Sequence, residues 1–155
     1  MKAFLKGFVY AGRGFWFCLR HERNFRIHLA AAAAVLALAP FFRLTRGEWA
    51  ALILTLALVI GAEALNTAVE QAVDLASPGH HPKARAAKDA AAGAVLVCAA
   101  GAVGVGIALF FRPAVWAALW TGLLARPWLI AAPLLFAALA LWFIIGGGVR
   151  GDPKP

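Results

Sequence analysis

Residues 49–74 read WAALILTLALVIGAEALNTAVEQAVD. The stretch is long enough to cross a bilayer as one helix, for which about 20 residues suffice. Its first half is apolar, yet its second half carries the three acids Glu63, Glu70 and Asp74. Ionisable groups inside a span cost at least ~2–3 kcal/mol each and mark a functional site by default. The stretch therefore predicts a membrane helix that carries a site.

The composition of the whole chain supports a membrane protein. Of its 155 residues, 63% are hydrophobic and 14% are charged, whereas soluble domains have roughly 45–50% apolar residues. We therefore expect an all-α integral membrane protein without a soluble domain. The apolar runs predict spans at residues 27–42, 48–72, 89–111 and 128–148. The first run is short, and we expect it to continue a helix that begins nearer the N-terminus.

The basic residues predict the orientation, because Lys and Arg accumulate on the cytoplasmic side. With four spans and a cytoplasmic N-terminus, only Arg43, Arg46, Arg112 and Arg126 of the 15 basic residues lie outside. This arrangement places both termini and the acid-bearing ends of the second and third spans at the cytoplasm. The residues predicted inside are Lys2, Lys6, Arg13, Arg20, Arg23, Arg26, Lys83, Arg85, Lys88, Arg150 and Lys154.

The N-terminal segment has the pattern of an amphipathic helix that lies on a membrane surface. At ~100° per residue, its basic residues form one stripe and most of its large apolar residues lie opposite. The pI of about 10.6 therefore indicates anionic lipid headgroups or a phosphate-bearing ligand, and not nucleic acid. A purely topological role of these charges remains an alternative. The two sets are Lys2, Lys6, Arg13 and Arg20 against Phe4, Phe8, Phe15 and Leu19.

The polar residues of the opening stretch share one helical face at ~100° per residue: Glu63, Asn66, Thr67, Glu70 and Asp74. At ~1.5 Å per residue, Glu63 lies about 10 Å deeper than Glu70. We expect neighbouring segments to bring Glu22, Lys88 and Asp89 to the same level, so that the acids gather near one interface with Lys88 among them. Carboxylates beside a lysine suit Mg²⁺ and a phosphate group, because Mg²⁺ prefers oxygen ligands and lysine supplies a positive charge.

Other chemistries find less support in the sequence. The chain has neither G-x-x-x-x-G-K-[ST] nor a G-x-G-x-x-G that follows a strand. Cys18 and Cys98 are too far apart to indicate a disulfide framework or a zinc site, and the adjacent His80 and His81 lack further ligands. Two alternatives remain open on the residues alone: a small proton or cation transporter, since acids within spans also form relays, and a structural scaffold.

Three stretches together resemble the small membrane-embedded lipid kinases of prokaryotes, diacylglycerol kinase and undecaprenol kinase: ERNFRIH (22–28), EALNTAVEQAVD (63–74) and AKDAAAGAV (87–95). The resemblance covers about residues 3–111. It implies a surface helix and three spans, usually in a homotrimer in the bacterial inner membrane. It also implies transfer of the γ-phosphoryl group of ATP to a lipid hydroxyl with Mg²⁺, at a cytoplasmic site between subunits.

The resemblance further implies a role for individual residues. Glu63 matches the general base, and Glu22 and Glu70 match the carboxylates that hold the metal and the nucleotide. Asn24, Arg26, Asn66 and Asp74 are expected to support the site or contact the substrate. The residues expected to contact the nucleotide are Tyr10, Glu22, Glu70, His81, Lys88 and Asp89.

Some positions distinguish the two branches of this family. Ile27, His28 and Ala92 resemble the undecaprenol kinase branch, so undecaprenol is the expected substrate and diacylglycerol the alternative. Gly79 and His80 depart from the family pattern in the loop before the third span. We expect residues 1–113 to form the lipid kinase domain and residues 114–155 to form an extension with a fourth span that is dispensable for the chemistry.

Overall fold

The computed structural model describes residues 2–79 and 81–148. These residues form helices, and the described ranges contain no strand. The predictions for His80, Arg150 and Lys154 concern residues outside these ranges. The α-helices are α1 (Lys2–His21), α2 (Arg23–Leu38), α3 (Arg46–Ala76), α4 (Pro82–Phe110), α5 (Pro113–Ala125) and α6 (Ala131–Gly146), and the short 3-10 helices are η1 (Ala39–Phe42) and η2 (Pro127–Ile130).

Among the described residues, four helical segments are long and apolar enough to cross a membrane, which confirms the all-α integral membrane class. They are Arg23–Phe42, Arg46–Ala76, Pro82–Phe110 and Pro127–Gly146. Many large apolar side chains on them are exposed, among them Leu54, Leu96 and Trp142. Such a surface is stable against lipid, where only helices and closed barrels satisfy all backbone hydrogen bonds. The chain is a multi-pass membrane protein.

Local signals explain where the helices begin. Helix α3 starts with a reciprocal cap, in which Thr45 N–H donates to Glu48 Oε2 at 2.7 Å and Glu48 N–H donates to Thr45 Oγ1 at 3.3 Å. Helix α4 starts with Pro82. Proline suits this position because the first N–H groups of a helix have no acceptor within the helix, so the lack of an N–H costs no hydrogen bond. Helix α2 ends where η1 begins, and η1 contains Pro40. Proline cannot continue the α-helical hydrogen-bond ladder.

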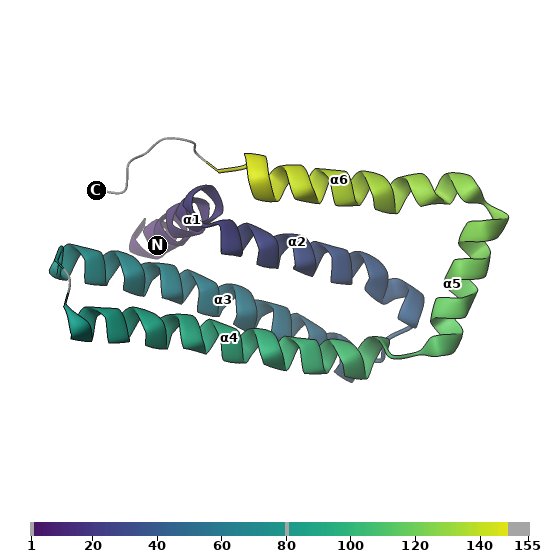
Figure 1. The fold of residues 1–155 in the computed structure, drawn as a ribbon, viewed down its shortest axis with the longest axis horizontal. Helices are drawn as coiled ribbons and strands as arrows, with labels where there is room; N and C mark the ends of the chain where they lie inside the picture. Colours follow the sequence, from purple (N-terminus) through teal and green to yellow (C-terminus); the bar gives the residue numbers. More distant parts are fainter. Residues whose placement is uncertain (1, 80, 149–155) are drawn as a thin grey trace.

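The arrangement of the helices brings several segments to one end of the bundle (Figure 1). Helices α3 and α4 form an antiparallel hairpin, α2 packs on α3, and α6 lies along α2 on its other side. The joint between α1 and α2 and the C-terminal end of α6 lie toward the α3–α4 loop, and the α3–α4 hairpin extends beyond both; we call this half of the bundle the hairpin end. Helix α1 also contacts α3.

The opposite end, which we call the α5 end, holds the apolar core of the bundle. Ala39, Leu52 and Leu109 are buried there, and partly buried side chains such as Trp49 and Phe110 pack against them. Arg112 links three segments by donating to the Phe42 carbonyl at 2.8 Å and pairing with Glu48. The hairpin end is thus free of the main core, and its polar groups can serve a site.

Two features differ from the sequence predictions. The first span begins at Arg23, before the predicted start at residue 27, and it begins no earlier because Glu22 is extended (φ −105°, ψ 114°) and separates α1 from α2. Helix α5 was not predicted as a separate element. It runs across the end of the bundle between α4 and η2 (Figure 1), and Pro113 and Pro127 begin the helices on either side of its C-terminal break. Its 13 residues are too few to span a bilayer.

Candidate active site

The polar face of α3 is turned inward at the hairpin end. Glu63 and Thr67 are each 3% exposed, and Asn66 and Glu70 are half-buried. The Thr67 hydroxyl donates to the Glu63 carbonyl at 3.1 Å, so its bond stays within the helix. This burial agrees with the predicted polar face. It leaves the Glu63 carboxylate enclosed, whereas Asp74, near the helix end, is exposed.

Helix α1 covers this face with the residues that precede Glu22. Cys18 is 5% exposed and lies beside Thr67, and burial raises the pKa of its thiol, with the charge of Glu22 acting in the same direction. Glu22 and Glu70 lie near enough for their charges to act on Glu63. An open, mostly apolar groove of about 380 Å³ runs between the two helices, lined by Ala11, Gly14, Phe15, Phe17, Cys18, Ala64, Thr67, Ala68 and Gln71.

Glu22 presents its carboxylate from the joint between α1 and α2. It occupies the N-cap position of α2, where a side-chain oxygen usually accepts a backbone N–H, but its side chain makes no such bond. Its backbone is used instead: its N–H donates to the Cys18 carbonyl at 2.9 Å, and its carbonyl accepts from the Arg26 N–H at 3.4 Å. The carboxylate therefore remains available to a ligand.

Asn66 carries an acceptor that the described residues do not satisfy. Its Nδ2 donates to Glu70 Oε1 at 3.0 Å, while its Oδ1 is buried without a partner. An unpartnered buried polar atom is costly, and an amide oxygen beside carboxylates is a suitable ligand for a hard cation such as Mg²⁺. No group of three His, Cys, Asp or Glu side chains among the described residues is close enough to hold a metal. Mg²⁺ typically takes one or two protein carboxylates and completes its shell with phosphate and water. The carboxylates of Glu22 and Glu70 and the amide oxygen of Asn66 are ligands of the type that this ion prefers.

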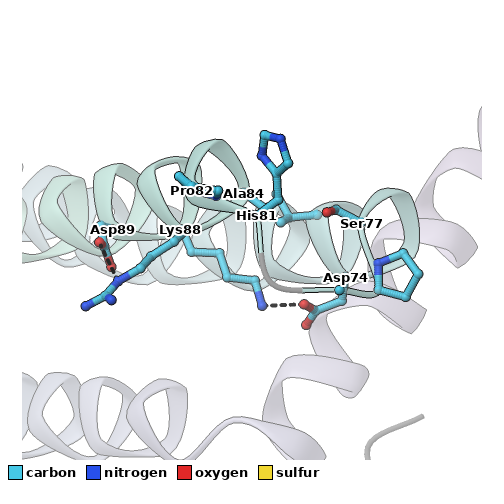
Figure 2. Close-up of a pocket in the computed structure, with 11 residues that line it drawn as sticks. Asp74, Ser77, His81, Pro82, Ala84, Lys88 and Asp89 are labelled. Atoms are coloured by element: carbon cyan, nitrogen blue, oxygen red, sulfur yellow. Dashed lines mark hydrogen bonds and ion pairs between the residues drawn. The ribbon is translucent and has the colours of Figure 1, made fainter.

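A second pocket, of about 600 Å³, lies at the α3–α4 loop (Figure 2). Lys88 of α4 reaches across to Asp74 of α3 and forms an ion pair with it. Asp89 lies on the other side of Lys88 and approaches Arg85 at 3.7 Å. His81 accepts the Lys83 N–H on Nδ1 at 3.2 Å, which caps the start of α4. The pocket thus combines lysine and arginine charges at the loop end of a helix hairpin.

The structure divides the predicted site residues between these two places. Glu22, Glu63, Asn66 and Glu70 gather between α1 and α3, whereas Asp74, His81, Lys88 and Asp89 line the hairpin pocket. The sequence predicted one gathering of acids around Lys88. The division has a local cause, because Lys88 pairs with Asp74, one helical turn beyond Glu70.

The remaining predicted residues lie outside both places. Tyr10 is exposed on α1, with the Arg13 guanidinium 6.0 Å from its ring. Asn24 is exposed, and Arg26 is buried with its guanidinium on backbone carbonyls. Sequence reasoning gave no site role to Cys18, which lies four residues before Glu22 and whose carbonyl accepts the Glu22 N–H.

The fold and the site define a class of protein: a membrane helix bundle with a buried carboxylate and a lysine-lined pocket at one end. The model of the prokaryotic diacylglycerol kinase family matches residues 9–110, which end with the last residue of α4. The chain belongs to this family, and it is a lipid kinase. Helices α5 and α6 lie beyond the matched residues.

Three curated relatives illustrate the similarity. Undecaprenol kinase of Bacillus subtilis is 47% identical over 110 residues, which cover 71% of this chain and 89% of that protein. A diacylglycerol kinase of Synechocystis is 44% identical over 110 residues, or 70% of this chain and 63% of the relative. A diacylglycerol kinase of Helicobacter pylori is 32% identical over 96 residues, or 62% and 75%. No solved structure matches the chain.

Proposed function

We propose that the protein transfers the γ-phosphoryl group of ATP to the hydroxyl of undecaprenol and releases undecaprenyl phosphate and ADP. The observation that carries this proposal is the buried Glu63 carboxylate beneath Glu70 and the unpartnered Asn66 oxygen, at the end of a membrane bundle. Identity of 47% to an undecaprenol kinase and the residues Ile27, His28 and Ala92 support the lipid. The activity requires a site that reaches both lipid and water, and we place this site at the hairpin end of the bundle.

Glu63 acts as the general base in this proposal. The lipid oxygen forms a bond to the γ-phosphorus, the bond from that phosphorus to the bridging oxygen of ADP breaks, and the hydroxyl proton moves to Glu63. Base catalysis requires a carboxylate within hydrogen-bond reach of the hydroxyl. At ~1.5 Å per residue, Glu63 is about 10 Å deeper than Glu70, which matches a hydroxyl that lies below the level of the phosphates.

Glu22 and Glu70 would hold Mg²⁺, and the Asn66 oxygen is a further ligand or a support for it. When bound there, Mg²⁺ would supply positive charge to neutralise the phosphates, and charge neutralisation and positioning together dominate catalysis of phosphoryl transfer. Lys88 and Asp89 are assigned to the nucleotide phosphates, with His81 and Tyr10 nearby. Asp74 pairs with Lys88, and the ammonium group can move from this pair onto a phosphate.

We further propose that the site is completed between the subunits of a homotrimer in the bacterial inner membrane, with the hairpin end at the cytoplasm. Residues 1–113 form the kinase domain and residues 114–155 the extension. The division of the site residues between two places in one chain supports a shared site. A Cβ added at Gly93, Gly101 or Gly104 of α4 would meet nothing within 4 Å, which leaves room for the close helix contacts that small residues permit.

The proposed function is tested with purified protein in mixed micelles that contain undecaprenol and γ-labelled ATP. We expect label in the lipid phase, abolished by a chelator and restored by Mg²⁺. The same protein reconstituted into vesicles should give no proton or cation flux. Flux without lipid phosphorylation would replace the kinase by a transporter.

Diacylglycerol is the second candidate substrate, because the Synechocystis and Helicobacter relatives are named for it. A parallel assay with diacylglycerol separates the two lipids. Faster labelling of diacylglycerol would reassign the substrate and leave the chemistry unchanged.

A further inference from the structure

A buried arginine ties the extension to the joint that carries Glu22. Arg26 lies in the first turn of α2 and is 5% exposed. Its Nε and Nη2 both donate to the Ile144 carbonyl of α6 at 3.2 Å. Its Nη1 donates to the Leu19 carbonyl at 3.1 Å and the Arg20 carbonyl at 3.4 Å, both in α1. One guanidinium therefore joins three helices.

The acceptors of these bonds are helix ends. Helix α1 ends at His21 and α6 at Gly146, so the carbonyls that Arg26 contacts belong to the last turns. Carbonyls of a last turn lack partners within their helix and carry partial negative charge. A planar guanidinium with five donors can serve two such ends at once, which the ammonium group of lysine cannot do with the same geometry.

The position of Arg26 in its own helix is unfavourable for a cation. It lies at the N-terminal end of α2, where the helix dipole favours negative charge, and the first turn of α2 contains no acid. Its burial adds a desolvation cost. The bonds to α1 and α6 offset both effects. Arg26 is therefore stable in this place only while both helix ends are docked on it.

The end of α6 is shaped for this contact. A Cβ added at Gly148 would lie 2.9 Å from Nη2 and 3.3 Å from Nη1 of Arg26. The first distance is shorter than real Cβ contacts allow, so the guanidinium would have to move. At Gly146, two residues earlier, an added Cβ would meet only the Trp142 ring at 3.4 Å, and Trp142 is exposed and free to shift.

We propose that Arg26 is a positioning residue, through which the C-terminal end of α6 holds the α1–α2 joint and thereby the Glu22 carboxylate. Helix α6 is then a coupled part of the kinase and not an independent extension, although it lies beyond the residues that match the family. Glu22 is the single residue between α1 and α2, so a change in the angle of that joint moves its carboxylate directly. The consequence for metal binding rests on the proposed function, in which Glu22 holds Mg²⁺.

Cys18 offers a readout of the joint that does not depend on kinase activity. It is a buried residue of α1 on the side that faces Thr67 of α3, and burial raises the pKa of its thiol, so it should react slowly with a maleimide. Loosening α1 exposes it. The measurement uses full-length protein with Cys98→Ala, so that Cys18 is the remaining thiol.

The experiment compares Gly148→Val with the matched control Gly146→Val in that background. We expect Gly148→Val to speed labelling of Cys18 about tenfold or more, because local opening controls access to a buried group. The same variant should raise the Mg²⁺ concentration for half-maximal activity several-fold, while kcat at saturating Mg²⁺ changes little. Gly146→Val should change neither. Arg26→Lys should resemble Gly148→Val, and its ammonium group should not restore the contact.

The outcomes separate this inference from the proposed function. Unchanged Cys18 labelling in both Gly148→Val and Arg26→Lys refutes the coupling, whatever the kinase does. Faster labelling with an unchanged Mg²⁺ requirement refutes the link from the joint to Glu22. A wild-type protein without kinase activity refutes the proposed function, and the labelling rates still decide whether α6 holds the joint.

Discussion

Replacing Glu63 by glutamine tests the assignment of the general base. The change keeps the shape of a side chain that is 3% exposed and removes its ability to accept a proton. The Thr67 bond goes to the Glu63 backbone carbonyl, so it survives the substitution. Loss of a general base typically costs ~10²–10⁴-fold in rate, which corresponds to about 3–5 kcal/mol of activation free energy.

The matched substitution is Glu70→Gln, seven residues along the same face. The glutamine Oε1 can still accept from Asn66 Nδ2, which donates to Glu70 Oε1 at 3.0 Å in the wild type. What is lost is a charged ligand for the metal. We expect Glu70→Gln to raise the Mg²⁺ concentration for half-maximal activity and weaken nucleotide binding, with the rate recovering at high Mg²⁺. Glu63→Gln should bind Mg·ATP almost normally and should not recover.

The assay is the initial rate of lipid phosphorylation over a range of Mg²⁺ concentrations, together with nucleotide binding measured separately. Thr55→Val serves as a control for general damage to α3, because the Thr55 hydroxyl bonds only to the Ala51 carbonyl of its own helix at 2.7 Å. Its rate should equal that of the wild type. Substantial turnover in Glu63→Gln, or a defect that disappears at high Mg²⁺, would refute the assignment of Glu63 as the base.

Four further outcomes are expected. Lys88→Met should raise the KM for ATP about 10–100-fold, which corresponds to the loss of one charged hydrogen bond, and Lys83→Met should leave the KM unchanged. The exposed Lys88–Asp74 pair adds little stability, so the melting temperature of Lys88→Met should hardly change. Arg112→Ala should lower the free energy of unfolding by about 1–3 kcal/mol and leave the KM for ATP unchanged, as thermal denaturation and kinetics would show. Truncation after Pro113 should leave measurable activity with a raised Mg²⁺ requirement, and a reporter fused there should change compartment; a well-inserted but inactive truncation would contradict this. Cross-linking in detergent should give trimers, and monomers alone would count against a shared site.

The spans and the polar face of α3 could be predicted from the sequence because both depend on local pattern. A run of apolar residues fixes a span by its transfer free energy. The i, i+4 spacing of Glu63 and Thr67 puts them on one face of any helix, and both are buried. Thr45 and Glu48 likewise form the cap that their three-residue spacing allows.

The break at Glu22 could not be predicted from local pattern, because no proline or glycine marks it. It depends on contacts between helices, such as the bond from Arg26 to the Ile144 carbonyl of α6 and the edge-to-face contact of Phe15 in α1 with Phe25 in α2, whose ring centroids are 5.1 Å apart. The contact of Arg26 with α6 could not be predicted for the same reason, since its acceptor, the Ile144 carbonyl, lies 118 residues away.

The partner of Lys88 also depends on tertiary structure. The spacing along the chain places Lys88 at the level of several acids, and the geometry of the α3–α4 loop selects Asp74. Helix α5, in contrast, had a signal that could have been used. Pro113 and Pro127 bound a run too short to cross a membrane, and proline is common in the first turn of a helix.

The central claim is tested most directly by competition between lipids at one site. Purified protein is given Mg²⁺, γ-labelled ATP, and undecaprenol and diacylglycerol together at equal mole fraction in the same micelles, and the two labelled products are separated and counted. Their ratio gives the relative kcat/KM of the two substrates without any correction for protein activity. We predict that undecaprenyl phosphate is the dominant product and that Glu63→Gln abolishes both products. Dominant labelling of diacylglycerol would contradict the substrate, and an unlabelled lipid phase with active ATP hydrolysis would contradict lipid phosphorylation itself.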